Sequence, residues 1–392
     1  MEGGKKLAEG GYGCVFHPEI NCKGKETTNK KYISKVQRED FSAKNETEIG
    51  KILYETYKSD PAKPLEVNFA PVISSCPINV RKISVPDISS CSIINKVIDR
   101  TTNFVIMKIR YIDMKDFDKY VIENADANLI IFTLLSSYNH LLKSIDLLIR
   151  AKVVHLDLKG SNIVFDTKKA TPVIIDFGLS MPLYKKIELS DYFYIYEPGY
   201  YTWPIEVHYI NLLLHQEDEP ADHNLKDLAD RYVKANSALH PFSVGFKKKY
   251  TELIFKTLKK YNKVDKKNIT DKIIQESWKT WDNYSLSIIY LKFINFIAHA
   301  QDNEMLNNNL INFIVKLTLQ NIHPDYTKRL TIGETQRQFN TFLYNEKNEN
   351  IASLREITEQ ITKNKHTINT RIERDSKISK IMSKNIVKSR RK

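Results

Sequence analysis

Residues 153–162 have the sequence VVHLDLKGSN, and residues 173–178 have the sequence VIIDFG. Each motif has an apolar run rich in β-branched residues, which favours a strand, and each then turns polar. Asp157, Asn162 and Asp176 therefore stand just beyond the ends of two expected strands. A lone His-x-Asp or a lone Asp-Phe-Gly is commonplace. The two together, with fourteen residues from Asn162 to Asp176, predict a functional site rather than two turns.

These side chains meet the needs of phosphoryl transfer. The reaction requires a carboxylate that orients the attacking hydroxyl and accepts its proton, and cations that neutralise the charge of the phosphates. We expect Asp157 to be that carboxylate and Lys159 to stabilise the transferring group. Asn162 and Asp176 are the expected metal ligands. His155 is expected to hydrogen-bond the backbone rather than to act as a base.

Glycines near the start of the chain predict a phosphate-binding hairpin. The sequence AEGGYGCV at residues 8–15 has glycines where a hairpin must bring its amides close to phosphate oxygens. By itself this pattern is weak, because glycine clusters are commonly ordinary turns. The nucleotide-binding residues expected here are Ala8, Gly10, Gly11, Gly13 and Val15, the last placed to cover an adenine.

A lysine and a glutamate complete the expected phosphate site. Lys35 ends the β-like run YISK at residues 32–35, from which it can reach phosphates and take part in catalysis. Its partner is expected on the helical stretch 41–58. Apolar residues follow Glu46 at i+3 and i+7, whereas a lysine follows Glu48 at i+3. This spacing favours Glu46 and keeps Glu48 as the alternative.

The organisation of the chain predicts an α+β fold. Short β-like runs with turns between them fill about the first hundred residues, and only 41–58 has helical spacing there. Past Asn128 the apolar residues recur with helical spacing. We expect a small sheet-rich N-terminal lobe with one helix and a larger helical lobe. The expected boundaries are 1–107 for the first lobe, 108–344 for the second with a helical insertion at 207–281, and 345–392 for a tail.

Composition narrows the setting. The chain has 392 residues, 42% of them hydrophobic and 27% charged, which is enough apolar material for a globular core. Four cysteines without close C-x-x-C pairing fit neither a disulfide framework nor a zinc module, so we expect a reducing, cytoplasmic setting. The first residues lack the apolar core of a secretory signal, and no apolar run is long enough to span a bilayer.

The positive charge is concentrated at the C-terminal end. The formal net charge is +13, and eleven Lys or Arg between Lys363 and Lys392 face only Glu373 and Asp375. With few large apolar residues, the tail is expected to be mobile and dispensable for catalysis. A nucleic-acid or anionic-surface partner is the alternative interpretation of this charge.

Taken in order, the motifs between about residues 5 and 344 resemble those of eukaryotic-type protein kinases. The resemblance implies a two-lobed kinase fold that uses ATP with Mg²⁺ or Mn²⁺. Lys35 matches the lysine of the family's V-A-I-K strand. The run VIMKI at residues 105–109 looks like the last strand of the small lobe. This implies Met107 as gatekeeper, with Lys108, Ile109 and Arg110 offering backbone groups to adenine.

Later motifs imply a protein substrate. The sequence WPIE at 203–206 resembles the A-P-E element, and DNYSL at 282–286 resembles the D-x-W-S-L start of a buried helix. In the family, the arginine matched by Arg329 pairs with the glutamate matched by Glu206. Lys159 is a feature of the serine/threonine type. The insertion at 207–281 follows Glu206 directly, so we expect it to border the acceptor site of a monomeric enzyme.

Departures from the family pattern carry further expectations. Ala8 replaces a glycine, Gly199 replaces a threonine, and the spacing from Glu206 to Asp282 is roughly sixty residues longer than in the family. Leu156 replaces the arginine that, in the family, binds the phosphate of a phosphorylated activation loop. The replacement implies activity without that phosphorylation. The W-P-x-E form and the richness in Lys, Asn, Ile and Tyr most resemble kinases of large nucleocytoplasmic DNA viruses, implying a host cytoplasm or virion.

Two other classes of function stay open. A pseudokinase would keep the fold and work as a binding scaffold. Loss of Lys35, Asp157, Asn162 or Asp176 would favour it, and all four are present. A nucleic-acid-associated protein would bind through the basic tail, with steep salt dependence.

Overall fold

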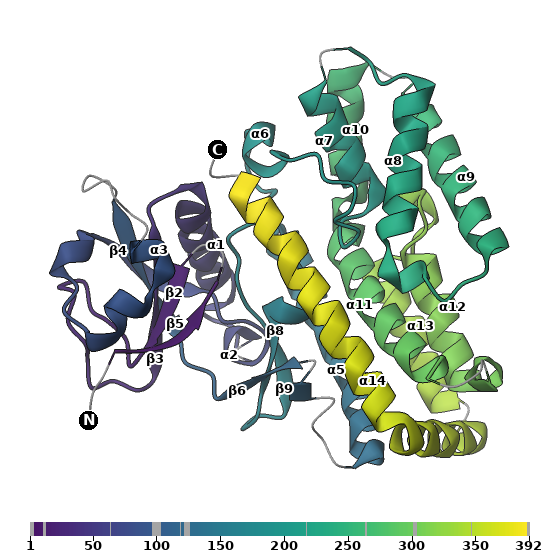
Figure 1. Cartoon of the computed structure of the whole chain (residues 1–392), viewed down its shortest axis with the longest axis horizontal. Coiled ribbons are helices and arrows are strands. Elements are labelled where there is room, and N and C mark those ends of the chain that lie inside the picture. Colours follow the sequence, from purple (N-terminus) through teal and green to yellow (C-terminus); the bar gives the residue numbers. More distant parts are fainter. Residues whose placement is uncertain are drawn as a thin grey trace.

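The computed structural model describes residues 4–10, 13–62, 64–95, 103–117, 119–120, 126–216, 218–262, 265–300, 304–345 and 347–389. A sheet-rich N-terminal part is followed by a mainly helical C-terminal part (Figure 1). This mixed arrangement is compatible with the predicted α+β, two-lobed fold. The N-terminal elements are β1 (Lys5–Glu9), β2 (Gly13–His17), β3 (Tyr32–Arg38), α1 (Phe41–Tyr57), α2 (Pro64–Asn68), β4 (Val72–Ile78), α3 (Ser92–Asn95) and β5 (Phe104–Arg110).

The C-terminal part is built mostly from helices with three short strand pairings among them. Its strands are β6 (Met114–Asp116), β7 (Val153–Val154), β8 (Ile163–Asp166), β9 (Thr171–Ile174) and β10 (Met181–Pro182). Its helices are α5 (Ala127–Arg150), α6 (Leu189–Tyr192), α7 (Ile205–His215), α8 (Asp222–Ala235), α9 (Val244–Tyr261), α10 (Lys266–Ser277), α11 (Trp281–Ala298), α12 (Asn309–Asn321), α13 (Ile332–Asn345) and α14 (Lys347–Ser389).

The N-terminal strands form one antiparallel sheet in the order β1-β2-β3-β5-β4. Its register places Val15 opposite Lys35, and Lys35 opposite Met107. Since cross-strand partners share one face of a sheet, these three side chains form a row across β2, β3 and β5. The sheet therefore aligns three residues that lie far apart in the sequence.

Helix α1 is fixed at its start and along one face. The Asp40 carboxylate caps the helix by accepting from the amide of Ala43 at 3.0 Å. Ile49 and Leu53, at i+3 and i+7 from Glu46, are fully buried. Glu46 lies on the same buried face, which brings a carboxylate into the interior beside the sheet.

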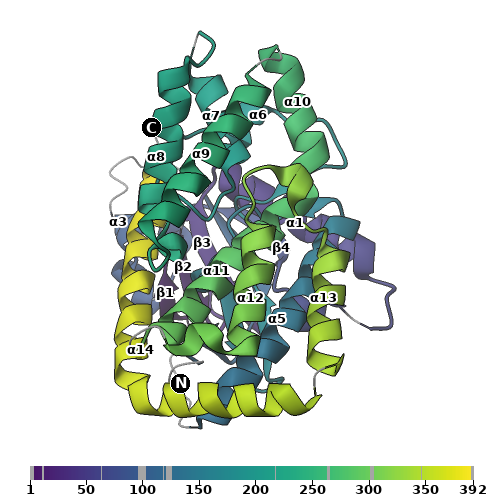
Figure 2. The same ribbon diagram turned by 90° about the vertical axis from the view of Figure 1, so that its right-hand side faces the viewer.

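Helix α11 forms the centre of the helical part. Nearly all of its residues are buried, and it packs against α5, α12 and α14 (Figure 2). A helix buried on all sides needs other helices around it to cover its apolar surface. No helix among the described residues combines the length and apolarity required to cross a membrane.

Residues 207–281 are largely helical and contain most of α7 together with α8, α9 and α10. In Figure 1 these helices stand at the upper right, above α11, α12 and α13. The segment reaches the 178–203 stretch at Ser237, whose hydroxyl lies 2.7 Å from the Tyr201 hydroxyl.

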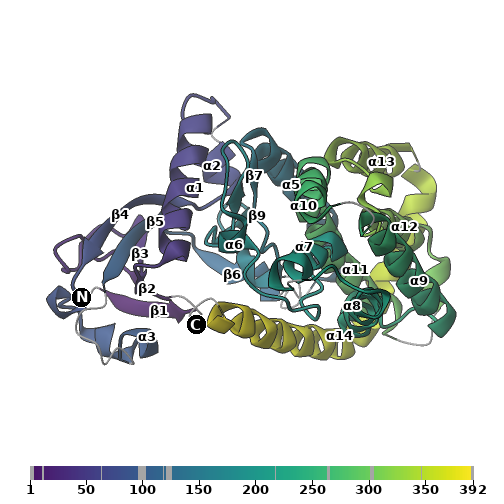
Figure 3. The same cartoon turned by 90° about the horizontal axis from the view of Figure 1, so that it is seen from above.

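The tail differs from the mobile end that its composition predicts. Residues Lys347–Ser389 form α14, which bends at Asn364 and lies against α5, α11 and α12. The tail has few aromatic residues, so its composition does not predict packing against the rest of the chain. Its isoleucines recur at helical spacing, however, and form a buried face. Figure 3 shows the second half of α14 running toward the N-terminal sheet. The buried isoleucines are Ile357, Ile361, Ile368, Ile372 and Ile386.

The cysteines also differ from the prediction, because all four form disulfides. Cys14 bonds to Cys91 and Cys22 to Cys76, with Cα atoms 6.0 and 5.9 Å apart. Sequence separations of 77 and 54 residues hid these pairs, which the folded N-terminal part brings together. The inference of a reducing compartment from unpaired cysteines therefore loses its basis.

Candidate active site

Lys35 joins three elements. From β3 its Nζ atom lies 2.7 Å from Glu46 Oε2 on α1 and 3.0 Å from Asp176 Oδ1, just beyond β9. Glu48, the alternative partner, instead accepts hydrogen bonds from Tyr184 and Lys185 near the surface. The structure thus brings Lys35, Glu46 and Asp176 together and leaves Glu48 outside.

Burial and charge together shift the pKa values of this trio. Burial alone would lower the pKa of Lys35, but the charges of Asp176 and Glu46 outweigh it and raise that pKa. Burial raises the pKa of Glu46 to about 7, against the opposing effect of Lys35. Burial would also raise the pKa of Asp176, yet the Lys35 charge holds it below its usual value. Lys35 and Asp176 therefore stay charged at neutral pH.

Asp157 is held at both of its carboxylate oxygens. Lys159 Nζ lies 2.7 Å from Oδ2, and Asn162 Nδ2 donates to the same oxygen at 2.9 Å. The Tyr200 hydroxyl donates to Oδ1 and also lies 3.5 Å from Lys159 Nζ. All four residues are buried, so these bonds fix the orientation of the carboxylate.

The backbone next to Asp157 is held in an uncommon conformation. Leu156 has φ of 61°, a region that costs a branched side chain about 1–3 kcal/mol. Asp282, at the start of α11, accepts the amides of His155 and Leu156 at 2.8 and 3.1 Å. Trp203 Nε1 donates to the Leu156 carbonyl at 2.5 Å. These hydrogen bonds offset the conformational cost at Leu156 and fix the orientation of the 155–162 loop.

His155 contacts the backbone, and its ring lies 3.0 Å from the Ile175 carbonyl oxygen. The strand pairing of β8 with β9 places Asn162 and Ile175 at the same end of that hairpin, where the Ile175 amide donates to the Asn162 carbonyl at 3.0 Å. Asn162 and Asp176 therefore flank the same end of the β8–β9 hairpin. Asp176 has φ of 63° there.

Helix α1 also positions the chain after Asp176. Asn45 donates from Nδ2 to the carbonyls of Gly178 and Ser180 at 3.2 and 2.7 Å. A Cβ on Gly178 would lie 2.5 Å from Ser42 Oγ, so a larger residue would push the segment away from α1. The close approach keeps Asp176 within reach of Lys35.

The predicted glycine hairpin lies at the edge of the sheet. Strands β1 and β2 pair with Ala8 opposite Val15, and the Gly10 amide donates to the Gly13 carbonyl at 2.9 Å. A Cβ on Gly13 would come within 2.5 Å of the Val36 carbonyl oxygen, which explains the glycine there. Gly11 lies outside the described residues.

The predicted adenine contacts need correction. Strand β5 lies between β3 and β4, and Lys108 and Ile109 pair with residues of both neighbours. Their backbone groups are thereby directed into the sheet rather than toward a ligand. The strand ends at Arg110, which pairs with Tyr32, and the Tyr111 amide still donates to the Lys31 carbonyl at 2.9 Å, so a backbone contact to a ligand would have to come after that amide. Met107 is fully buried within the row described above.

The later motifs meet in the helical part. Arg329 forms two bonds with Glu206, at 2.5 and 2.8 Å, and neither side chain is exposed to solvent. Trp281 Nε1 donates to the same carboxylate at 3.0 Å. This buried ion pair joins the start of α7 to the loop that precedes α13.

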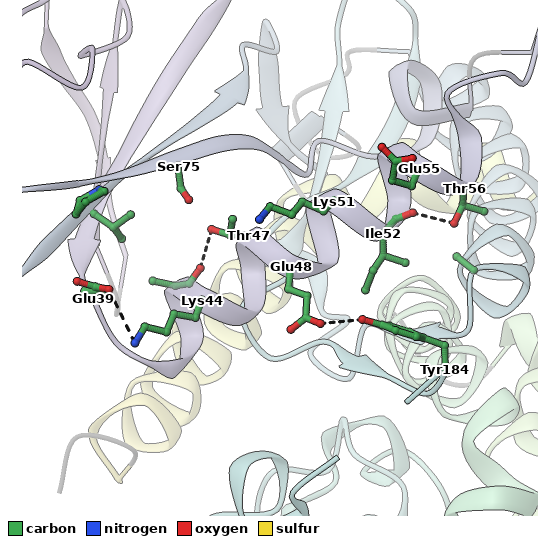
Figure 4. A pocket seen from close by; sticks show the side chains of 14 residues that line it. Glu39, Lys44, Thr47, Glu48, Lys51, Ile52, Glu55, Thr56, Ser75 and Tyr184 are labelled. Atoms are coloured by element: carbon green, nitrogen blue, oxygen red, sulfur yellow. Dashed lines mark hydrogen bonds and ion pairs between the residues drawn. The ribbon is translucent and has the colours of Figure 1, made fainter. Parts of the chain in front are cut away.

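One large cavity lies away from this cluster. It has a volume of about 880 Å³ and lies along the face of α1 that carries Lys44, Glu48 and Lys51. Figure 4 shows Glu48 in contact with Tyr184 at this cavity. Because neither Lys35 nor Asp157 lines it, its size carries no argument about the chemistry.

Sequence reasoning missed the roles of Tyr200, Trp203 and Asp282 at the site. Gly199 stands where the family has a threonine, and the adjacent Tyr200 was an available hydroxyl. Asp282 was recognised as a helix start, but its bonds to the 155–162 loop depend on a separation of over 120 residues in the sequence.

Comparison with known proteins shows a short similarity to a protein kinase. No protein-family model matches the chain. Mitogen-activated protein kinase kinase kinase 8 of Rattus norvegicus is 43% identical to it over 58 residues. The match covers 15% of this chain and only 12% of that protein. The chain therefore has a local similarity to a protein kinase, limited to 58 residues.

Proposed function

We propose that this chain is a protein kinase that transfers the γ-phosphate of ATP to serine or threonine hydroxyls of other proteins. The observation that supports it best is Lys35 paired with both Glu46 and Asp176. Asp157, held by Lys159 and Asn162, supplies the second half of the site. The short similarity to a known kinase agrees with this proposal.

The N-terminal sheet would bind the nucleotide. Backbone amides of the hairpin around Gly10 and Gly13 would approach phosphate oxygens, and Lys35 would bind the α- and β-phosphates. Val15 and Met107 flank Lys35 in the cross-strand row and would face the base. The chain that follows the bonded amide of Tyr111 would supply the backbone contacts to adenine.

Asn162 and Asp176 suit Mg²⁺ or Mn²⁺. Among the described residues no group of three or more His, Cys, Asp and Glu gathers to hold a metal ion. Mg²⁺ needs no such group, because one or two oxygen ligands of the protein suffice when phosphates supply others. The bound ion would neutralise phosphate charge. Lys35 would keep Asp176 ionised and oriented for it.

On the acceptor side, Asp157 would orient the attacking hydroxyl and take its proton. Lys159 would lie beside the transferring group, because it already contacts Asp157 Oδ2. The resemblance of 203–206 and 282–286 to protein-kinase elements favours a protein acceptor over a small molecule. We propose a monomeric enzyme.

The proposal includes activity without phosphorylation of the 178–203 segment. Leu156 is buried and offers no charge to a phosphate. Phosphatase treatment, checked by mass spectrometry, should change the initial rate by less than twofold. A tenfold loss would contradict this part of the proposal.

The resemblance to viral kinases suggests a host-cytoplasm or virion setting. Thiols are normally reduced in cytosol, whereas both disulfides would persist in an oxidising setting. Alkylation of thiols at the moment of cell lysis, followed by mass spectrometry, distinguishes the two. If all four cysteines are alkylated, the chain is reduced in the cell, which would support a cytoplasmic setting. If no cysteine is alkylated, both disulfides are present in the cell, which would contradict that setting.

Incubation of the purified chain with radiolabelled ATP, Mg²⁺ and either casein or histones tests the main proposal. We expect transfer that Asp157→Asn abolishes and Asp146→Asn, on the surface of α5, leaves unchanged. ATP binding without transfer would favour a pseudokinase. Salt-dependent nucleic-acid binding without either would favour the nucleic-acid alternative.

A further inference from the structure

The second half of α14 lies beside the 155–162 loop. Ile372, Asp375, Ser376 and Ser379 form one wall of a small cavity of about 30 Å³. Its other walls come from the loop itself, from the end of the 178–203 segment and from α11. Those walls include Lys159, Gly160, Ser161, Lys292, Phe293 and Phe296.

An ion pair holds this half of the helix in place. Asp375 Oδ2 lies 2.6 Å from Lys292 Nζ on α11, and both side chains are largely buried. Ser237 Oγ donates to Asp375 Oδ1 at 3.1 Å and lies 2.7 Å from the Tyr201 hydroxyl. Through Ser237, Asp375 is thus linked to Tyr201. The neighbouring residue Tyr200 donates a hydrogen bond to Asp157.

Apolar contacts continue on the same face. Ile368 and Ile372 meet Phe293 and Ile297 of α11 and Leu134 of α5 around a second small cavity. The opposite face of the helix carries exposed charged residues, including Glu373, Arg374 and Lys377. The helix is therefore amphipathic, with its apolar face on the surface that adjoins Lys159.

We propose that this surface, formed by Lys292, Phe293, Phe296 and the adjoining Gly160 and Ser161, is where the acceptor protein docks, and that α14 occupies it as an internal competitor. The proposal rests on the proposed kinase function. Lys292 selects an acceptor segment that presents a carboxylate, and Phe293 selects a branched apolar side chain near it. α14 supplies both groups, in Asp375 and Ile372.

The position of the surface supports an acceptor rather than a nucleotide. It adjoins Lys159, but the Lys35–Glu46–Asp176 cluster lies on the sheet side of Asp157. Displacement of α14 therefore opens the side from which a hydroxyl reaches Asp157. The cavity that α14 shares with the 155–162 loop is lined by neither Lys35 nor Asp176.

A chain that ends after Asn369 tests the proposal, because it keeps the contacts of Ile357, Ile361 and Ile368. Against the full chain, we expect KM for casein to fall at least fivefold, with KM for ATP changed less than twofold. In the full chain, Asp375→Asn should also lower KM for casein, as the truncation does. The matched control Glu373→Gln, exposed on the same helix, should leave it unchanged.

A direct binding measurement separates docking from catalysis. A fluorescent peptide of residues 370–389 should bind the shortened chain, and casein should displace it whereas ATP should not. The same peptide with Asp375→Asn should bind at least fivefold more weakly. Thermal unfolding of the shortened chain checks that it remains folded.

The outcomes distinguish the two proposals. If neither chain transfers phosphate, the kinase proposal fails and the docking proposal falls with it. If both transfer phosphate with equal KM for casein, or ATP displaces the peptide, the docking proposal alone is overturned. A gain seen with basic histones but not with acidic casein would overturn the role assigned to Lys292.

Discussion

Tyr200 is a group at the candidate site that the motifs do not name. Its hydroxyl is the donor at Asp157 Oδ1 and the neighbour of Lys159. Its ring packs edge-on against Trp203 at 4.9 Å, so the hydroxyl has a fixed position. We assign Tyr200 a positioning role, acting through Asp157.

Replacing Tyr200 with phenylalanine should lower kcat by about tenfold, with little effect on the ring packing. Because Tyr200 acts through Asp157, the fall should appear in kcat while KM for ATP changes less than twofold. Tyr201→Phe is the matched control, since Tyr201 contacts Ser237 instead. Lower stability with an unchanged kcat would leave Tyr200 a purely structural residue.

Glu46 should produce a pH dependence of its own. Its pKa is raised to about 7, so the carboxyl is ionised above this pH and protonated below it. Activity should fall as the pH drops through about 7, because Lys35 then loses an ion-pair partner. Glu46→Gln should lower kcat/KM about 10- to 100-fold at pH 8 and remove that limb.

The control for this prediction is Glu48→Gln, on the same helix near the surface. It should keep both the rate and the acid limb of the parent chain. An acid limb that persists unchanged in Glu46→Gln would assign the titration to another group.

Single residues were predictable where the information is local. Lys35 lies within β3, Asn162 directly precedes β8, and Asp157 and Asp176 follow β7 and β9. Each therefore lies in or beside a strand, and strand patterns are readable from sequence. The choice of Glu46 over Glu48 came from helix spacing. The contacts assigned to Lys108 and Ile109 were wrong, because the sequence does not show that β5 has a partner on both sides.

At the scale of elements, the Glu206–Arg329 pair joins α7 to the segment before α13. Arg329→Ala would leave a buried carboxylate without its partner, which typically costs 3–5 kcal/mol. Denaturant unfolding should show a loss of about that size. Arg355→Ala, at an exposed pair with Glu359, should change stability by less than about 0.5 kcal/mol.

A second variant tests the cause of this loss. Glu206→Gln combined with Arg329→Met removes both charges and should recover part of the stability. If the double variant were less stable than Arg329→Ala, an unpaired charge would not explain the loss.

The elements themselves were partly predictable. The β-like runs near the N-terminus and the helical spacing past Asn128 correspond to described strands and helices. α14 was missed, because five isoleucines spread over thirty residues of mostly charged sequence look like a solvated tail. Only α5, α11 and α12, which lie far away in the chain, provide the surface that makes them a buried face.

At the scale of the whole molecule, both disulfides lie within the N-terminal part. Replacing Cys14 and Cys91 together with serine should lower the free energy of unfolding by about 2–4 kcal/mol. Thermal unfolding with and without reductant measures this. The reductant should destabilise the parent chain more than the double variant, which retains one disulfide. Equal effects would indicate that Cys14 and Cys91 do not form a bond in solution.

The bend at Asn364 divides α14 into two parts that contact different surfaces of the molecule. The first part packs against neighbouring helices, and the second part lies over the surface that we propose for the acceptor. On that proposal, sequence change beyond Asn369 can accumulate without loss of the phosphate-binding groups. In a lineage of such chains, the last twenty or so residues would be free to diverge with the proteins that each chain modifies, so substrate range could evolve from the end of the chain.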